Sequence, residues 1–156
     1  CVDRSFLMNR LHIAVAAGVS VALLGGAYIF EYFGYPPCTM CYWQRWPHMA
    51  AIAIGVLALI FPARVLGYLG ALAALTTAAI GVYHSGVEKM WWEGPTSCTG
   101  TGGLDNLAGA DLLSTAGPRL IMCDQVSWDL FSLSMASWNV VFSLIAVWLW
   151  LVAARR

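Results

Sequence analysis

Leu11–Phe30 reads LHIAVAAGVSVALLGGAYIF, a run of 20 residues without Asp, Glu, Lys or Arg. Three further runs lack these residues: Trp46–Ala63 with 18 residues, Val65–Val87 with 23 and Leu130–Ala154 with 25. A helix needs about 20 residues to cross roughly 30 Å of hydrocarbon. The second run is short, but it can begin as far back as Cys41, which gives it about six turns. The four runs predict an all-α membrane protein, a bundle of four transmembrane helices.

The composition favours a membrane protein over a soluble one. Of the 156 residues, 60% are hydrophobic and only 10% are charged, whereas a soluble domain carries about 25% charged residues. A soluble protein of this size cannot bury four helices that are apolar on nearly every face. We therefore expect a single integral membrane domain over residues 1–156, with helices at about 11–32, 41–61, 65–87 and 130–154. Aqueous loops are expected at about 33–40 and 88–129.

Glycines within the runs predict where helices approach one another closely. The first run contains Gly18, Gly25 and Gly26, and the third contains Gly67 and Gly70. Small residues let the backbones of membrane helices come together. Both runs are therefore expected to pack tightly against neighbouring helices.

Basic residues predict the orientation in the membrane. Four spans place both termini and the Phe61–Arg64 turn on one side, which carries five of the eight basic residues: Arg4, Arg10, Arg64, Arg155 and Arg156. An excess of Lys and Arg near helix ends marks the cytoplasm. We therefore expect cytoplasmic termini, with the two loops on the opposite side. The chain starts at Cys1 without a Met, and we expect a truncation rather than a lipidated terminus, since lipidation needs an exported N-terminus.

The longer loop carries a helical pattern of its own. Leu104, Leu107, Ala108 and Leu112 follow helical spacing, and the acidic residues nearby lie off that face. This spacing predicts a short amphipathic helix on the membrane surface. The alternative is a helix that faces the core of a small folded cap.

Four cysteines, Cys38, Cys41, Cys98 and Cys123, fall in or at the edge of the two loops on the non-cytoplasmic side. Thiols in an oxidising compartment are expected to form disulfides. Two pairs in two loops are what a thiol–disulfide relay needs, because a thiolate of one pair can attack the disulfide of the other. The alternatives are two structural disulfides or a zinc site, although a zinc site lacks a second closely spaced pair.

The cysteines differ in their surroundings. Cys98 lies in a polar, Gly-rich stretch, whereas Cys123 precedes Asp124, whose negative charge disfavours a thiolate. Cys98 is therefore predicted to be the exposed sulfur that meets a protein partner. Cys41 lies at a helix N-terminus with Arg45 one turn later. The helix dipole and the Arg charge both favour a thiolate there.

Flat aromatic rings and hydrogen-bond donors surround Arg45, a combination that suits a planar, greasy ligand such as a quinone: Trp43, Gln44, Trp46 and His48. The alternative for Arg45 is an interfacial side chain that snorkels to water, and for the aromatic residues it is membrane anchoring. His84 lies near the exit of the third helix on the same side and is able to donate to a quinone oxygen or relay a proton. Its alternative, favoured by the residues alone, is an interfacial histidine with satisfied hydrogen bonds.

Residues 37–48, PCTMCYWQRWPH, closely resemble the signature of the DsbB family, the membrane quinone reductases that reoxidise the periplasmic thiol oxidase DsbA. The similarity continues through residues 84–88, 91–98, 123–124 and 134–139 and covers nearly the whole chain. Ser132 and Ser137 depart from the pattern, since they stand where we expect glycine.

The resemblance implies a four-helix bundle in the bacterial inner membrane. It implies that Cys98–Cys123 accepts electrons from a DsbA-like partner, that Cys38–Cys41 receives them, and that Cys41 meets the quinone. The cofactor would be ubiquinone or menaquinone, with no metal. The quinone site would be formed by Arg45, Gln44, His84 and Trp43.

The expected partners are a DsbA-like thiol oxidase, membrane lipid and the quinone pool, with no nucleic acid, and the expected state is a monomer. A vitamin K epoxide reductase-like protein is the rival enzyme, but its Cys-x-x-Cys motif follows the loop cysteines, whereas here it precedes them. The non-enzymatic rival is a structural membrane protein with inert disulfides.

Overall fold

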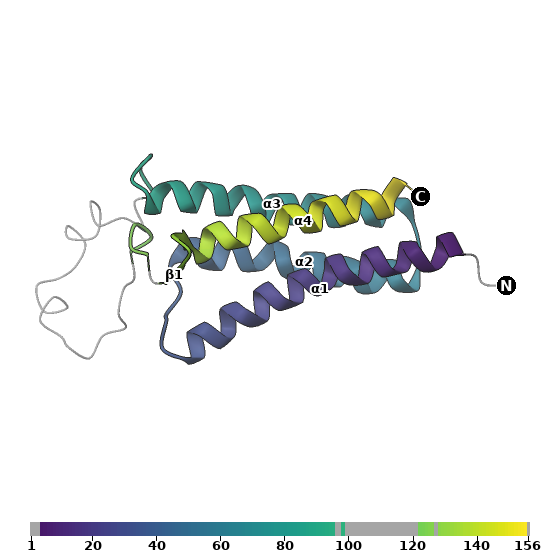
Figure 1. Cartoon of the computed structure of the whole chain (residues 1–156), viewed down its shortest axis with the longest axis horizontal. Coiled ribbons are helices and arrows are strands. Elements are labelled where there is room, and N and C mark those ends of the chain that lie inside the picture. The colour runs from purple at the N-terminus through teal and green to yellow at the C-terminus, as the bar shows by residue number, and fades with distance from the viewer. Residues whose placement is uncertain (1–3, 96–97, 99–121, 127, 156) are drawn as a thin grey trace, which may run out of the picture.

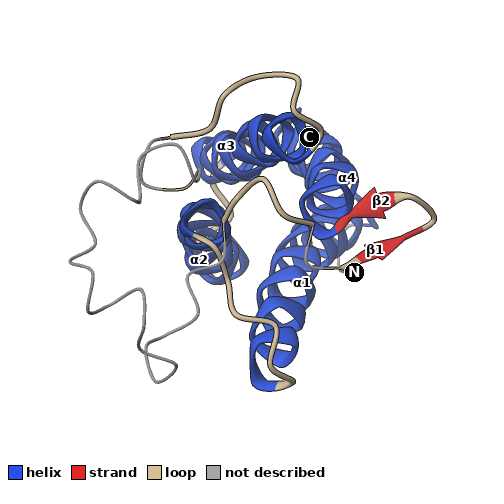
Figure 2. Cartoon of the chain, turned by 90° about the vertical axis from the view of Figure 1, so that its left-hand side faces the viewer, coloured by secondary structure: helices blue, strands red, loops and turns tan. Residues whose placement is uncertain are grey.

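The computed structural model of the chain describes residues 4–95, 98, 122–126 and 128–155. Four long helices run along the molecule: α1 (Arg4–Tyr32), α2 (Thr39–Ile60), α3 (Arg64–Glu88) and α4 (Met135–Arg155). Figure 1 shows the beginning of α1 and the end of α4 at the same end of the bundle, and Figure 2 shows the helices from the opposite end. Since the chain crosses the bundle four times, the α1–α2 connection and the segment before α4 lie together at the other end.

Three of the helices are long and apolar enough to cross a membrane, by length and composition, among the residues described. These spans are Asn9–Tyr32, Arg64–Glu88 and Met135–Arg155. Helix α2 has 22 residues, but Gln44, Arg45 and His48 lower the hydropathy of its first half. All three of these polar side chains are buried. The cost of placing them in an apolar environment is therefore reduced by contacts within the protein.

At the end of the bundle that holds the termini, a core of mostly small side chains joins all four helices: Ile13, Ala16, Ala58, Ala71, Ala74, Ala146, Trp150 and Ala153. We call this the packed half. A Cβ atom on Gly70 would lie 2.5 Å from the Trp150 ring, and one on Gly67 would lie 2.8 Å from the Cβ of Ala154. The close approach expected of Gly67 and Gly70 is confirmed, because only a residue without a Cβ leaves room for these neighbours.

At the other end the helices separate, and we call this the open half. Helix α1 diverges from the other three helices toward Tyr32 (Figures 1 and 2). A Cβ atom on Gly18, Gly25 or Gly26 would meet nothing within 4 Å. The expectation that these three glycines pack closely against another helix is therefore wrong. Their small size instead leaves space beside α1.

The last helix begins later than the charge-free run suggested. Instead of a helix from residue 130, Asp129–Leu130 (β1) and Leu133–Ser134 (β2) form a small antiparallel hairpin. Phe131 and Ser132 make its turn with φ values of 54° and 62°. Two consecutive left-handed residues are the geometry of a two-residue hairpin turn and are incompatible with a right-handed helix. The helix starts only after this turn, at Met135.

Helix α3 ends in a turn that redirects the chain toward Cys98. Met90 has φ 56°, and the amides of Met90 and Trp91 donate to the carbonyls of Val87 and Gly86 at 3.0 and 2.9 Å. This is the Schellman arrangement that closes many helices. The expected amphipathic helix near residues 104–112 lies outside the described residues.

Candidate redox site

The two cysteine pairs lie together at the open end of the bundle. Cys98 and Cys123 form a disulfide, with their Cα atoms 5.2 Å apart, and the Cys123 amide donates to the Cys98 carbonyl at 2.7 Å. Cys38 and Cys41 are free thiols whose sulfurs lie 2.9 Å apart. Buried Met40 and Val87 pack with these cysteines in one cluster. The structure therefore brings the four predicted cysteines together from segments far apart in the sequence.

Local geometry places the Cys-x-x-Cys pair. Cys38 follows two prolines and has an extended backbone, φ −78° and ψ 171°, so it caps α2 rather than joining it. Its sulfur accepts a hydrogen bond from the Cys41 amide at 3.3 Å. An N-cap side chain that satisfies a free amide of the first turn stabilises the helix start. The same geometry holds the two sulfurs within reach of each other.

The proton of the pair belongs on Cys38. The hydrogen bond to Cys41, together with burial, raises the pKa of the Cys38 thiol well above its ordinary value. A thiol with a raised pKa keeps its proton, so we take Cys38 as the hydrogen-bond donor and the Cys41 sulfur as the acceptor. This arrangement leaves Cys41 as the acceptor, in agreement with its expected thiolate character.

Exposure does not separate Cys98 from Cys123. Cys98 is 2% exposed and Cys123 is fully buried. The prediction of an exposed Cys98 is therefore wrong, because the cluster around Val87 covers both sulfurs. What distinguishes them is that the Cys123 sulfur, the Cys38 sulfur and a ring nitrogen of His84 lie within 4.8 Å of one another.

The same three side chains have the composition of a metal site. A cysteine ligates a metal as a thiolate, and the Cys123 sulfur is bonded to Cys98. With that disulfide formed, only Cys38 and His84 of the three offer a ligand atom. Two ligand atoms are fewer than the three or four protein ligands of the usual zinc sites.

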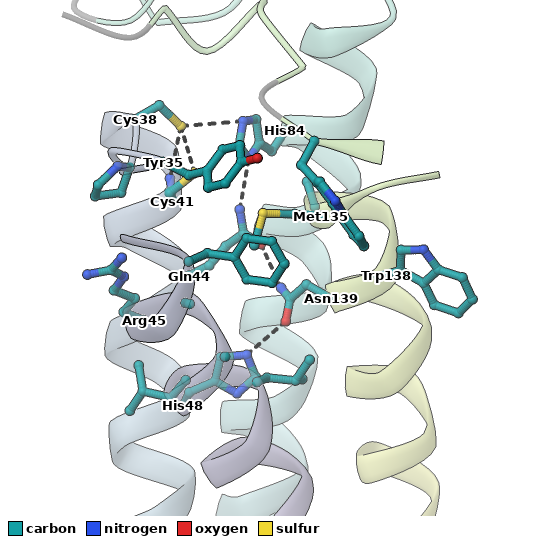
Figure 3. Close-up of a pocket in the computed structure, with 18 of the residues that line it drawn as sticks. Tyr35, Cys38, Cys41, Gln44, Arg45, His48, His84, Met135, Trp138 and Asn139 are labelled. Carbon is teal, nitrogen blue, oxygen red and sulfur yellow. Dashed lines mark hydrogen bonds between the residues drawn. The ribbon is translucent and has the colours of Figure 1, made fainter. Parts of the chain in front are cut away.

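A cavity of about 420 Å³ lies directly below the Cys-x-x-Cys pair (Figure 3). Its walls are mostly apolar and come from α1, α4 and the hairpin, including Phe30, Trp128, Leu130 and Trp138. The polar side chains that line it include seven from α2, α3 and α4, namely Cys41, Gln44, Arg45, His48, His84, Glu88 and Asn139, together with Tyr35 and Gln125 from the connecting segments. An apolar pocket with a few converging polar groups is the usual form of a small-molecule site.

Arg45 lines this cavity, but its guanidinium turns toward α1. It forms an ion pair with Glu31 at 2.7 Å and lies 4.5 and 4.9 Å from the ring centres of Tyr28 and Tyr42. The side chain is buried, and its Nε has no hydrogen-bond partner among the described residues. Glu31 therefore offsets much of the Arg45 charge, and Nε remains as a free donor.

His84 lines the cavity together with Cys38 and Cys41 (Figure 3). It is 3% exposed, and its Nε2 is 3.5 Å from the Cys38 sulfur and 3.8 Å from a Glu88 oxygen. Its Nδ1 is 2.9 Å from the Gln44 amide nitrogen. A buried histidine with these neighbours differs from the interfacial histidine that the residues alone favoured.

The structure does not bring Trp43 into this group. Its side chain is 42% exposed, and it is not among the residues that line the cavity. Helix α2 turns Gln44 and Arg45 inward, and because consecutive helix residues point about 100° apart, Trp43 faces outward. Of the predicted site residues, Gln44, Arg45, His84 and the four cysteines are therefore neighbours, and Trp43 is apart from them.

Sequence reasoning missed three polar residues near the cavity. Asn139 on α4 bonds to Gln44 and His48, Thr77 on α3 bonds to His48, and Glu31 pairs with Arg45. One signal was available, since a polar residue inside an apolar span often marks a functional site. Asn139 and Thr77 both meet that criterion.

This combination defines a class of protein: a helical membrane protein with a disulfide and a dithiol stacked above an apolar cavity. Residues 9–153 match the family model described as Disulfide bond formation protein DsbB. The chain belongs to the DsbB family, whose members are membrane proteins that form disulfides.

Curated relatives agree over nearly the full length. The chain is 31% identical to Disulfide bond formation protein B of Aromatoleum aromaticum, covering 97% of this chain and 96% of that protein. It is 29% identical to Disulfide bond formation protein B 2 of Pseudomonas aeruginosa, covering 96% and 95%. It is also 29% identical to Disulfide bond formation protein B of Azoarcus sp., covering 94% and 93%. No solved structure matches the chain significantly.

Proposed function

We propose that this protein is a protein-dithiol:quinone oxidoreductase that reoxidises a periplasmic DsbA-like thiol oxidase. The partner's two thiols become a disulfide, and a membrane quinone, ubiquinone or menaquinone, becomes a quinol. Membership of a family named for disulfide bond formation supports the thiol chemistry. The proposals of a quinone acceptor and of a DsbA-like partner rest on the site geometry together with membership of this family.

One observation carries the proposal: the Cys123 sulfur lies within 4.8 Å of the Cys38 sulfur, and Cys41 lines the cavity beneath. Disulfide exchange requires a sulfur of one pair to approach a sulfur of the other. The arrangement offers a path for electrons from the loop disulfide to the Cys-x-x-Cys pair and on to a ligand in the cavity. Inert structural disulfides would have no need of a dithiol at the mouth of an apolar cavity.

The steps then follow in order. A partner thiolate attacks Cys98 and releases Cys123 as a thiolate, which attacks Cys38 of an oxidised Cys38–Cys41 pair and releases Cys41. The partner's second thiolate resolves the mixed disulfide and frees Cys98, which attacks Cys123 and restores the Cys98–Cys123 bond. Cys38 and Cys41 then hold the two electrons. In this state the protein holds one disulfide, Cys98–Cys123, and two free thiols, Cys38 and Cys41.

The cavity fits a quinone ring. Its volume is within the usual range for small-molecule sites, roughly 300–1,000 Å³, and the unpartnered Nε of Arg45 is a buried donor in its wall. We assign Arg45, Gln44 and His84 to hold the ring oxygens. A bound quinone would accept two electrons and two protons. Arg45 would stabilise negative charge that develops on oxygen in this apolar setting.

We further propose that α2 is the fourth membrane span, so that the chain is a single multi-pass domain. Its polar groups Gln44, Arg45 and His48 are buried, which makes the span tolerable in lipid. The excess of basic residues at the end that holds the termini supports cytoplasmic termini and periplasmic cysteines in the bacterial inner membrane. The proposed functional unit is a monomer, because the cysteines and the cavity come from one chain.

Stopped-flow mixing tests this function. The purified protein in detergent is mixed with a reduced DsbA-like protein and either ubiquinone or menaquinone, while the quinone absorbance is followed. One quinone should be reduced for each partner dithiol oxidised, and Cys41→Ser should abolish the signal. Partner oxidation at the same rate with and without quinone would refute the proposed acceptor. If the partner is oxidised with neither ubiquinone nor menaquinone, the proposed activity is refuted.

A further inference from the structure

A line of buried polar side chains extends from the cysteines into the middle of the bundle (Figure 3). His48 Nε2 lies 2.8 Å from Asn139 Oδ1, and Asn139 Nδ2 lies 2.6 Å from Gln44 Oε1. Gln44 Nε2 lies 2.9 Å from His84 Nδ1, and His84 Nε2 lies 3.5 Å from the Cys38 sulfur. The line joins α2, α3 and α4, and each member is buried to at least nine-tenths.

The two amides in this line can have only one orientation each. The nitrogen of Gln44 also faces the Met40 carbonyl at 3.4 Å, and the nitrogen of Asn139 also faces the Thr77 carbonyl at 3.5 Å. A backbone carbonyl only accepts hydrogen bonds, so the atom that faces it must be the NH₂ group. Turning either amide over would place two oxygens against each other in a buried setting, which is costly.

The donors then determine the protonation of each histidine nitrogen. Gln44 Nε2 can only donate, so His84 Nδ1 must accept, and the proton of neutral His84 is on Nε2. That proton faces the Cys38 sulfur and Glu88, and the Cys123 backbone is a further hydrogen-bond partner of His84. At the other end, Asn139 Oδ1 can only accept, so His48 donates from its Nε2. The bonds therefore all run in one direction, toward the cysteines.

We infer that Gln44 and Asn139 are positioning residues that fix the His84 tautomer, so that a one-directional chain of hydrogen bonds ends on the Cys41 sulfur. His84 donates to Cys38, and Cys38, which keeps its proton, donates to Cys41. Hydrogen bonds in such a chain polarise one another in a low-dielectric interior. The inference rests on the proposed function only in taking Cys41 as the sulfur that delivers electrons.

Charged groups near Cys41 act on it as well. Arg45 on α2 carries a positive charge and is paired with Glu31 on α1, and the charge of Glu88 on α3 also acts on Cys41. Asp124 lies on the segment of Cys123, whereas the facing side chain of α4, Asn139, is uncharged. These groups are the same in every variant below, so a change in the Cys41 profile reports on the hydrogen-bond chain.

The wild-type protein provides the first test. With ¹⁵N-labelled histidine, NMR distinguishes a protonated ring nitrogen from a bare one, and His84→Gln identifies the His84 signals. We expect the Nε2-protonated tautomer of His84 in the protein with Cys38 and Cys41 reduced. The Nδ1-protonated tautomer would overturn the inference without any variant.

The second test removes the amides. Asn139→Leu leaves Gln44 free to rotate, and Gln44→Met breaks both of its side-chain bonds. We expect each variant to populate both His84 tautomers and to lower the rate of Cys41 alkylation by iodoacetamide near pH 7 about tenfold, equivalent to one pH unit. Ser143→Ala is the matched control, because Ser143 donates to Asn139 Oδ1 from outside the chain. It should change neither readout.

Two results separate this inference from the proposed function, because neither NMR nor alkylation involves a quinone or a partner. A wild-type protein with the expected tautomer and alkylation profile but no quinone reduction would refute the proposed function alone. A wild-type alkylation profile in both amide variants, with the His84 tautomer retained, would overturn the inference alone. If Asn139→Leu fails to fold, the Gln44→Met variant and the wild-type NMR spectrum still test the inference.

Discussion

The two halves of the bundle are built from the same four helices but differ in how closely the helices pack. In the packed half, Gly67 and Gly70 bring α3 against α4 so closely that a single Cβ would collide. In the open half, α1 turns away, its glycines have no close neighbour, and a cavity of about 420 Å³ separates the helices. The packed half therefore provides the rigidity that lets the open half keep free space and buried polar groups.

The largest expected effect comes from removing the terminal sulfur of the open half. Cys41→Ser should lower quinone reduction at least about a thousandfold, because the nucleophile is lost. Cys38 then has no partner within its own pair, and the Cys123 sulfur lies within 4.8 Å of it. Mass spectrometry of the variant after exposure to the oxidised partner should find a Cys38–Cys123 link. A Cys38–Cys98 link in its place would reverse the order of the relay.

Arg45 tests whether the polar groups of the open half act on a ligand. Arg45→Ala should lower kcat/KM for the quinone about ten- to a hundredfold, since one charged hydrogen bond is worth roughly 1.5–3 kcal/mol. Arg45→Lys should be partly active, because it keeps the charge but loses the planar fork. Glu31→Gln is the control, because it removes the ion pair and keeps the guanidinium. It should lower stability and change kcat/KM for the quinone less than Arg45→Ala does. Unchanged quinone kinetics in Arg45→Ala would make this residue an anchor only.

Gly70 tests the packed half. Gly70→Ala places a Cβ 2.5 Å from the Trp150 ring and should destabilise the protein by about 1–3 kcal/mol through overpacking. Gly18→Ala meets nothing within 4 Å and should change stability by less than about 0.5 kcal/mol. Thermal unfolding of both variants in the same detergent gives the comparison. Equal destabilisation would mean that α1 is packed as tightly as α3.

The pH dependence of the Cys-x-x-Cys pair sharpens the contrast between its two sulfurs. Because the Cys41 hydrogen bond raises the Cys38 pKa above its ordinary value of 9.0, the stability gained from the Cys38 thiol is present below pH 9 and lost as pH rises above it. Peptide mapping after brief alkylation at pH 8 should show Cys41 modified about tenfold faster than Cys38. Similar rates at this pH would contradict the assignment of the proton to Cys38.

The smallest effect is expected in the hairpin before α4. Ser132 has φ 62°, a conformation that glycine adopts without a steric penalty. Ser132→Gly should therefore raise the free energy of unfolding by up to about 1 kcal/mol. Ser137 is not strained, and its hydroxyl bonds to Ser85 at 3.0 Å, so Ser137→Gly should be destabilising. A loss of stability in Ser132→Gly would show that the serine side chain compensates for the backbone strain.

The sequence by itself determined the four helices and the two cysteine pairs. Long charge-free runs are local features, and a run of about 20 apolar residues has few alternatives to a helix in a membrane. The PCTMCYWQRWPH stretch and its companions also predicted the family, which the match over residues 9–153 confirms. Turn chemistry was harder, since nothing in the charge-free run at Leu130 signalled the left-handed residues Phe131 and Ser132.

The tertiary structure decided how each helix is rotated about its axis. In helices that are apolar on nearly every face, hydrophobic periodicity does not specify which side chains face inward. The outward position of Trp43, the Arg45–Glu31 pair and the burial of Cys98 therefore could not be read from composition or spacing. The chain of amides from Asn139 to His84 joins residues up to 95 positions apart, as in the Asn139–Gln44 bond. Such contacts exist only after the small residues of the packed half have fixed the helices against one another.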